Sequence, residues 1–317
     1  MERNYGLDMA KCLCMIWVIG IVHLSQYLGN EYYLWYTIIG CNISYAALGT
    51  FSLIGGLLIG SRYTLNTFNN VCVFYKKRIL RFYPLFIIAT ILLCIIHFND
   101  IESSIAGLLG YSPFITKQPM TLWYISMMLI FYLITPLILN EHKYISGLLL
   151  LVLFCVYKML FVLDIRFIYN ISLYILGLLV ADKIDFIINT LRNKKVCFTM
   201  VLIYSLGLIF LHLNKINSLP SIVFSYCGVI AIFSISVVIE QYIKIKKIIS
   251  LLSYISLSFY LFHRFTYWLL LAIWHPDNIY ILTLYLVVVA FPLGAVFAYL
   301  MQKMYDAVNS KLGSAIV

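Results

Sequence analysis

The sequence predicts an all-α membrane protein, a polytopic helical bundle of about ten transmembrane helices with both termini in the cytoplasm. Hydrophobic residues make up 63% of the 317 residues, charged residues make up only 11%, and the mean hydropathy is +0.98. Soluble domains carry about 25% charged residues, so this composition indicates an integral membrane protein. Helices are the expected spanning unit because each one satisfies its own backbone polar groups in lipid.

Runs of about eighteen or more mostly apolar residues define the candidate spans. They lie near residues 9–28, 33–60, 79–98, 121–140, 144–163, 167–181, 196–213, 220–240, 249–273 and 279–303. The longest connections, near 61–78 and 99–120, leave no room for a soluble domain, so we expect a single transmembrane domain over residues 1–317. The first span follows neither a basic run nor a small-residue cleavage site, and we expect it to be retained.

The basic residues predict the orientation. Of the 22 Lys and Arg residues, Lys117, Arg166 and Lys215 would lie outside, Lys158 and Arg264 fall inside spans, and all others lie on the side of the N-terminus. This asymmetry favours cytoplasmic termini and an even number of spans. The net charge of +10 is then explained by topology and by contact with anionic lipid, without a nucleic acid partner.

The cysteines and glycines indicate helix packing. Most of the eight cysteines lie inside predicted spans, without a CxxC pair or a metal-type Cys and His spacing, so we expect neither disulfides nor a metal site. Gly56 and Gly60 place a small-xxx-small pattern at the end of the second span, where it predicts close approach of another helix.

His23 is the first candidate for chemistry. It follows Asp8 and Lys11 in the first span. At roughly 1.5 Å of rise per residue, His23 lies about 22 Å above Asp8, deeper than the midplane of a hydrocarbon core about 30 Å thick. Ionisable groups at that depth are costly and typically line a cavity or do chemistry.

Arg78 and Arg81 form the second candidate, at the start of the third span. They are three residues apart and precede Phe82, Tyr83 and Pro84. On a helix the two guanidinium groups would project from the same face, and such forks suit phosphate oxygens. The alternative is that these basic residues simply end the span at the bilayer surface. This alternative explains Lys76 and Lys77 but not the depth of Arg81.

The fourth and ninth spans carry the remaining candidates. Trp123 and Tyr124 lie at the outer end of the fourth, where aromatic residues either form an interfacial belt or contact substrate. The ninth contains Ser256, Tyr260 and His263, and His263 is expected roughly 20 Å from the cytoplasmic end, near the depth of His23. The two histidines suggest a shared polar cavity, although an intramembrane histidine can also simply bond a facing helix.

Taken together, these stretches resemble the acyltransferase-3 family, polytopic membrane enzymes that modify cell-surface glycans. The resemblance is carried, in chain order, by Arg3 with Leu7 to Lys11 leading to His23, by Phe51 to Leu58, by Arg78 to Pro84, by Trp123 to Pro136 and by Ser256 to His263. Gly55 departs from a serine that is common in the family, and Met128 stands where many members carry a glutamate.

The resemblance implies an O-acyltransferase of the bacterial inner (plasma) membrane. Such enzymes take an acyl group, usually acetyl, from cytoplasmic acyl-CoA and place it on a hydroxyl of a cell-surface or lipid-linked glycan. His23 matches the histidine implicated in acyl transfer. Arg78 and Arg81 match a basic pair implicated in handling acetyl-CoA, and Lys11 stands where many members have arginine.

A mechanism can be stated as a hypothesis. CoA would enter from the cytoplasm with its phosphates near Arg78, Arg81 and Lys11. His23 would act as general base on the sugar hydroxyl or carry the acyl group.

The remaining candidates would serve the acceptor. Tyr260, His263 and Ser256 would orient it or donate hydrogen bonds to the developing oxyanion, and Trp123 and Tyr124 would contact the substrate.

Two other classes of protein fit the same composition. A lipid-linked glycan flippase or polymerase is also polytopic and basic inside, but it predicts longer outer loops with clustered charges. A transporter or structural membrane subunit would use His23 and Arg81 for coupling or packing, but the sequence lacks the paired broken spans typical of many transporters.

Overall fold

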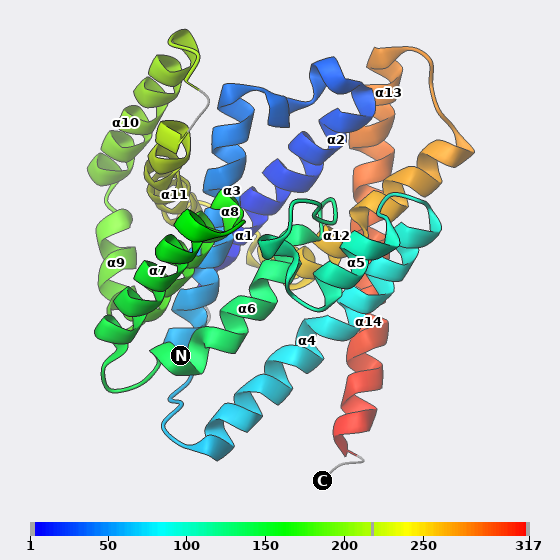
Figure 1. Ribbon diagram of the computed structural model, residues 1–317. Coiled ribbons are helices and arrows are strands. Elements are labelled where there is room, and N and C mark those ends of the chain that lie inside the picture. The colour runs from blue at the N-terminus through cyan, green and yellow to red at the C-terminus, as the bar shows by residue number, and fades with distance from the viewer. Residues whose placement is uncertain (1–3, 217–218, 315–317) are drawn as a thin grey trace. The chain divides into compact units, whose positions relative to one another are not determined.

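The computed structural model describes residues 4–216 and 219–314, and Arg3 lies outside them. Within these ranges the regular structure is helical and no strand occurs (Figure 1). Eight helices are long and apolar enough to cross a membrane: Tyr5–Leu28, Ile38–Gly60, Phe68–Ile95, Lys143–Leu160, Lys194–Leu213, Leu219–Glu240, Lys246–Ile273 and Ile279–Ser310. Two shorter apolar helices, Trp123–Ile138 and Ile165–Leu179, match the predicted fourth and sixth spans. The predicted all-α polytopic membrane fold is confirmed.

Several helices begin where a short polar side chain accepts backbone hydrogen bonds. Asn4 accepts from the N–H groups of Gly6 and Leu7 at the start of α1 (Tyr5–Met15). Thr37 and Thr67 cap α3 (Ile38–Gly60) and α4 (Phe68–Ile95) in the same way. Such caps satisfy N–H groups that the first helical turn leaves without a partner.

The third span begins eleven residues before its predicted start. α4 starts at Phe68, so Arg78, which lay just before the predicted span, is inside the same 28-residue helix as Arg81. The prediction was wrong because it followed hydropathy, which falls across the basic run, whereas the helix start is set by the Thr67 cap. Pro84 also lies inside α4, where it removes one backbone hydrogen bond without ending the helix.

Residues 4–62 and 172–256 form one compact unit. It contains α1, a π-helix (Ile16–Val22), α2 (His23–Ser25), α3, α9 (Ile184–Leu191), α10 (Lys194–Leu213) and α11 (Leu219–Glu240), together with the second half of α8 (Ile165–Leu179) and the start of α12 (Lys246–Ile273). α11 packs against α1, α3 and α10, which makes it the central helix of this unit.

A buried polar network joins three helices of the first unit. The Asn42 side chain on α3, fully buried, donates to the carbonyl oxygen of Ser221 on α11 at 2.6 Å. The hydroxyl of Tyr204 on α10 donates to Asn42 Oδ1 at 2.8 Å. Hydrogen bonds between spans fix their register because a polar side chain left unsatisfied in an apolar bundle is costly.

Residues 63–171 and 257–314 form the second unit. It contains α4, α5 (Ile101–Leu108), α6 (Trp123–Ile138), α7 (Lys143–Leu160), α13 (Ile279–Tyr285), a second π-helix (Leu286–Ala290) and α14 (Phe291–Ser314), with the remaining parts of α8 and α12. α4 contacts α5 and α6, and the hydroxyls of Tyr75 and Tyr83 on α4 donate to carbonyl oxygens of Leu133 on α6 and Leu108 on α5. The single domain expected over residues 1–317 stays a prediction.

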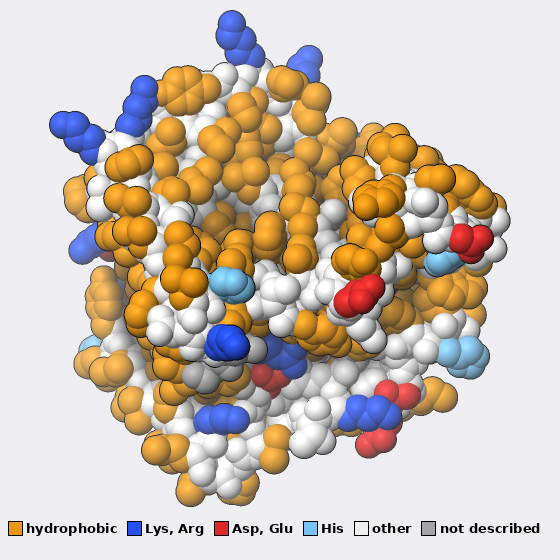
Figure 2. Space-filling model, turned by 90° about the horizontal axis from the view of Figure 1, so that it is seen from above, with side chains coloured by type: hydrophobic (Ala, Val, Ile, Leu, Met, Phe, Trp, Pro, Cys, Tyr) orange, Lys and Arg blue, Asp and Glu red, His pale blue; other side chains and the backbone are white. Residues whose placement is uncertain are grey.

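The outer surface of the helices is apolar. On α7 the side chains of Leu148, Leu149, Val152 and Met159 are all more than half exposed. Hydrophobic side chains cover most of the face shown in Figure 2. An apolar surface this extensive is expected where helices face lipid and not water.

Gly56 on α3 and Gly177 on α8 allow the two helices of the first unit to touch through their backbones. A Cβ atom on Gly56 would lie 2.1 Å from the carbonyl oxygen of Tyr174, and one on Gly177 would lie 2.3 Å from that of Leu53. The packing role predicted for Gly56 follows from this contact.

We therefore expect Gly56→Val to lower the melting temperature of the detergent-solubilised protein by several degrees and to reduce its folded yield, because the added atoms force the backbones apart. Gly55→Ala is the matched control, since it adds a side chain one residue away, about 100° around the helix, at a half-buried position. Equal stability of the two variants would contradict the close-packing role.

Candidate functional site

His23 lies at the end of an irregular stretch of the first span. Residues Ile16–Val22 form a π-helix, and the backbone N–H of His23 donates to the carbonyl oxygen of Val18, five residues back. π-type turns are rare and occur frequently at functional sites. The His23 side chain is only 8% exposed, so the imidazole is held within the protein at the point where helical geometry changes.

Lys11 is held by a carboxylate in the same unit. Its ammonium group lies 3.6 Å from Asp8 Oδ1, and the Ser253 hydroxyl on α12 donates to the same oxygen at 2.6 Å. The Asp8 side chain is 10% exposed and that of Lys11 is 21% exposed. Lys11 thus neutralises a buried carboxylate in this structure, a structural role that its place in the sequence did not predict.

Arg78 is buried in a cage of aromatic rings in the second unit. Its guanidinium carbon lies 5.0, 5.8 and 5.9 Å from the ring centroids of Tyr63, Phe74 and Tyr132. The side chain is 9% exposed, and its buried Nε–H has no hydrogen-bond acceptor among the described residues. Ring faces attract a cation and fix its orientation, but they do not replace a hydrogen-bond acceptor.

Arg81 differs from Arg78 in its surroundings. The two residues are one turn apart on α4, yet Arg81 is exposed whereas Arg78 is buried. Arg78 and Arg81 therefore do not share one face of α4 as expected, because Arg78 is on its inner side and Arg81 on its outer side. Positions three residues apart are offset by about 60° around a helix, which allows this difference. One anion would contact both only at the edge of the aromatic cage.

Thr121 connects the start of α6 with α12 in the second unit. It adopts a φ of +65°, a strained value for a β-branched residue, at a cost of order 1–3 kcal/mol. Its carbonyl oxygen accepts from the Tyr260 hydroxyl at 2.5 Å, and its hydroxyl accepts from Arg264 Nε at 3.2 Å. The next residue on its N-terminal side, Met120, is held through two backbone hydrogen bonds to the Asn99 side chain. These contacts together hold the strained backbone.

Four of the expected site residues lie in one row of aromatic contacts. Trp123 and Tyr124, Tyr124 and Tyr260, and Tyr260 and His263 each have ring centroids 6.0 Å apart. All four side chains are at most 8% exposed, which excludes a simple interfacial belt in contact with water. The structure thus brings together residues from α6 and α12 that are more than a hundred positions apart in the sequence.

The protonation of His263 follows from its contacts. Nδ1 lies 2.8 Å from the carbonyl oxygen of Tyr260 and 3.2 Å from that of Phe259. Carbonyl oxygens only accept hydrogen bonds, so Nδ1 carries the proton. A neutral His263 therefore has its lone pair on Nε2.

The hydroxyl groups of Tyr260 and Ser256 donate hydrogen bonds to the protein backbone in this structure, whereas the sequence suggested that they would serve the acceptor or the oxyanion. The Tyr260 hydroxyl donates its proton to Thr121, and the Ser256 hydroxyl donates to the carbonyl oxygen of Ser253 on its own helix at 2.9 Å. Their hydrogens are therefore committed in this structure to main-chain carbonyls, because a hydroxyl has only one hydrogen to donate.

Sequence reasoning assigned no role to Arg264, Thr121 or Arg166. Arg264 is 2% exposed, with its guanidinium carbon 5.3 Å from the Phe98 ring, and its place inside a span was a signal for function. The Arg166 guanidinium lies 4.2 Å over the Trp123 ring and is also hydrogen-bonded to Asp164, contacts that no sequence pattern indicated.

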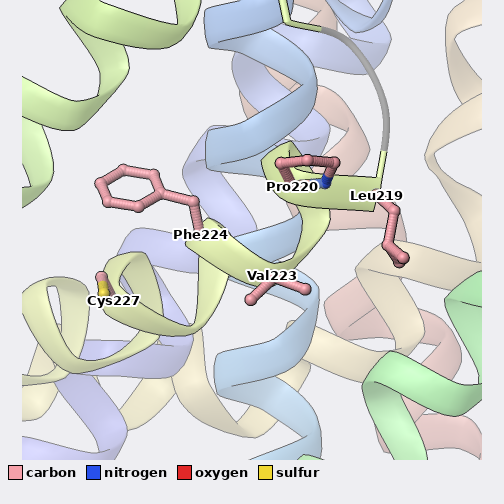
Figure 3. Close-up of a pocket in the computed structure, with 5 residues that line it drawn as sticks. All are labelled: Leu219, Pro220, Val223, Phe224 and Cys227. Atoms are coloured by element: carbon pink, nitrogen blue, oxygen red, sulfur yellow. The ribbon is translucent and has the colours of Figure 1, made fainter.

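An open groove of about 410 Å³ lies on α11 in the first unit (Figure 3). The groove is lined by residues from the first turns of that helix: Leu219, Pro220, Val223, Phe224 and Cys227. It lacks groups for acid–base chemistry, and it fits contact with lipid tails. Across the described residues, no cluster of three His, Cys, Asp or Glu side chains could hold a metal ion.

Comparisons with known proteins place the chain in a family. Residues 4–303 match the model of an acyltransferase domain, that of the acyltransferase-3 family. Neither the curated proteins nor the solved structures gave a match. The family match extends from the start of the first span into the last one and favours acyl transfer over the flippase and transporter alternatives. The chain therefore belongs to the acyltransferase-3 family and is a multi-pass membrane acyltransferase.

Proposed function

We propose that this protein is an O-acetyltransferase that moves an acetyl group from cytoplasmic acetyl-CoA to a hydroxyl of a cell-surface or lipid-linked glycan, in the inner membrane of a bacterium. The single observation that carries this proposal is the buried guanidinium of Arg78, because its Nε–H lacks an acceptor inside an otherwise apolar cage. An anionic donor such as a CoA phosphate supplies that acceptor.

Arg78 and Arg81 bind the phosphates of the donor. A guanidinium fork forms charge-assisted hydrogen bonds with phosphate oxygens, and the rings of Tyr63 and Tyr132 hold the Arg78 fork in one orientation before the donor arrives. The exposure of Arg81 suits it to meet the donor first. Lys11, already paired with Asp8, contributes positive charge near the cytoplasmic end of the first span.

His23 carries out the transfer. A neutral imidazole either removes the proton of the acceptor hydroxyl or takes the acetyl group briefly onto its own nitrogen. In both routes the C–S bond of the thioester breaks, a C–O bond to the sugar forms, and the proton of the hydroxyl ends on the released CoA thiol.

Aromatic residues of the second unit contact the acceptor in this proposal. A continuous aromatic row of the kind that packs against sugar rings is formed by Trp123, Tyr124, Tyr260 and His263. In this proposal Tyr260 and Ser256 act by fixing the backbone around the site, while His263 contributes its ring to the aromatic row.

His23→Ala should abolish transfer of labelled acetyl from acetyl-CoA to glycan in membranes while expression stays normal, because the proposal gives the hydroxyl proton or the acetyl group to the His23 imidazole. The matched control is His142→Ala, an exposed histidine at the start of α7, which should retain activity. Transfer by the His23→Ala variant at near the wild-type rate would remove His23 from the mechanism.

Arg78→Lys should raise KM for acetyl-CoA by about tenfold or more with little change in KM for the glycan, because lysine keeps the charge but loses the planar fork. Lys77→Ala, which removes an exposed charge next to it on α4, should change KM by less than about threefold. The measurement is the initial rate against donor concentration, and equal effects of the two variants would contradict a specific role for Arg78.

Glycans from cells with and without the intact gene should differ by one acetyl group per modified sugar, because the enzyme adds nothing else. Mass spectrometry of the released glycan checks this outcome. Identical glycan masses in the two strains would exclude a glycan acceptor, while leaving the family's acyl transfer intact.

A further inference from the structure

Gln26 carries a buried polar atom without a partner. Its carboxamide oxygen Oε1 is shielded from solvent, and among the residues that the structure describes no donor reaches it. Buried side-chain oxygens almost always accept a hydrogen bond from protein or from a bound molecule. Gln26 Oε1 is one of the few exceptions among the described residues, so it needs a physical explanation.

The local turn does not use the Gln26 side chain. The Ser25 hydroxyl donates to the carbonyl oxygen of Val22 at 2.7 Å and accepts from the N–H of Leu34 at 3.1 Å, which closes the loop after the helix. The backbone carbonyl of Gln26 accepts from the N–H of Gly29 at 3.4 Å. The turn is thus complete through Ser25 and the main chain, and a cap or packing role does not account for the amide.

Gln26 lies one helical turn beyond His23. The chain continues from α2 (His23–Ser25) into a 3-10 helix (Gln26–Leu28), with His23 and Gln26 both in helical conformation. Side chains three residues apart lie on the same side of such a segment. The unpartnered amide oxygen therefore belongs to a side chain one turn along the same segment from the proposed catalytic imidazole.

The chemistry of the atom limits what can bind it. An amide oxygen only accepts hydrogen bonds, so its ligand has to donate one. A lipid tail and a fully ionised phosphate have no hydrogen to give, whereas a sugar hydroxyl does, as do the amide N–H groups in the pantetheine arm of CoA, and KM for acetyl-CoA distinguishes these two ligands. We propose that Gln26 is an acceptor-binding residue, which accepts a hydrogen bond from a hydroxyl next to the one that His23 acetylates.

This inference rests on the proposed function and makes it narrower. His23 engages the reacting hydroxyl, and Gln26 Oε1 engages its neighbour on the same ring. The acceptor is then a carbohydrate with two adjacent free hydroxyls and not a simple alcohol. Gln26 fixes which of the two hydroxyls faces the imidazole, because a hydrogen bond to one places the other.

The test compares Gln26→Leu with wild-type protein in vesicles. Labelled acetyl-CoA is the donor, and glycan extracted from cells that lack the gene is the acceptor. We expect Gln26→Leu to raise KM for this glycan by about three- to tenfold, the scale of one neutral hydrogen bond, while KM for acetyl-CoA stays unchanged. The unchanged donor KM also shows that the variant is folded.

Two further variants sharpen the result. Gln26→Glu keeps an accepting oxygen at the same place and should keep a lower glycan KM than Gln26→Leu. Asn30→Leu removes the same kind of amide from an exposed position four residues on, and it should match the wild type.

The outcomes separate the inference from the function beneath it. If Gln26→Leu leaves both KM values unchanged while His23→Ala is inactive, Gln26 does not bind the acceptor and the proposed function stands. If Gln26→Leu and Gln26→Glu raise both KM values equally, the effect is structural and the inference fails. If the wild-type protein transfers no acetyl to the glycan, the proposed function fails and the inference fails with it.

Discussion

A polar side chain buried among apolar helices loses its contact with water, so it needs a partner within the protein or from a ligand. This constraint organises both compact units. In the first, Asn42 joins α3 to α10 and α11 through Tyr204 and Ser221. In the second, the strained Thr121 receives hydrogen bonds from Tyr260 and Arg264. Helix packing by apolar contact alone leaves register loosely specified, and these bonds specify it.

The same constraint makes a buried polar atom without a partner among the described residues a candidate for ligand binding. In the part of the chain that the structure describes, Arg78 Nε is a buried donor without an acceptor, and Gln26 Oε1 is a buried acceptor without a donor. The Arg78 nitrogen requires a ligand that accepts a hydrogen bond, whereas the Gln26 oxygen requires a ligand that donates one. One fits an anion such as the phosphate of CoA, and the other fits a hydroxyl such as that of a sugar. A transferase that joins an anionic donor to a hydroxylated acceptor needs both kinds of group.

Part of the site could be predicted from the sequence. His23 and His263 stood out because titratable groups are rare within apolar spans, Arg78 stood out through its spacing from Arg81, and the structure buries all three. The same rule applied to Arg264, which was overlooked beside His263 although its side chain is 2% exposed. Gln26 carried no such signal, because an uncharged amide near a helix end is ordinary in sequence and unusual only once its burial is known.

The sequence by itself determined the class of protein and the family, since these depend on composition, on the presence of long apolar runs and on motifs in order along the chain. Tertiary structure decided which partner within the protein each of these polar side chains contacts. The Tyr260 hydroxyl is bound to Thr121, Lys11 is paired with Asp8, and Arg78 sits in an aromatic cage. Hydrogen bonds and ring contacts form between residues distant in the chain, so no local pattern records where each donor and acceptor is satisfied.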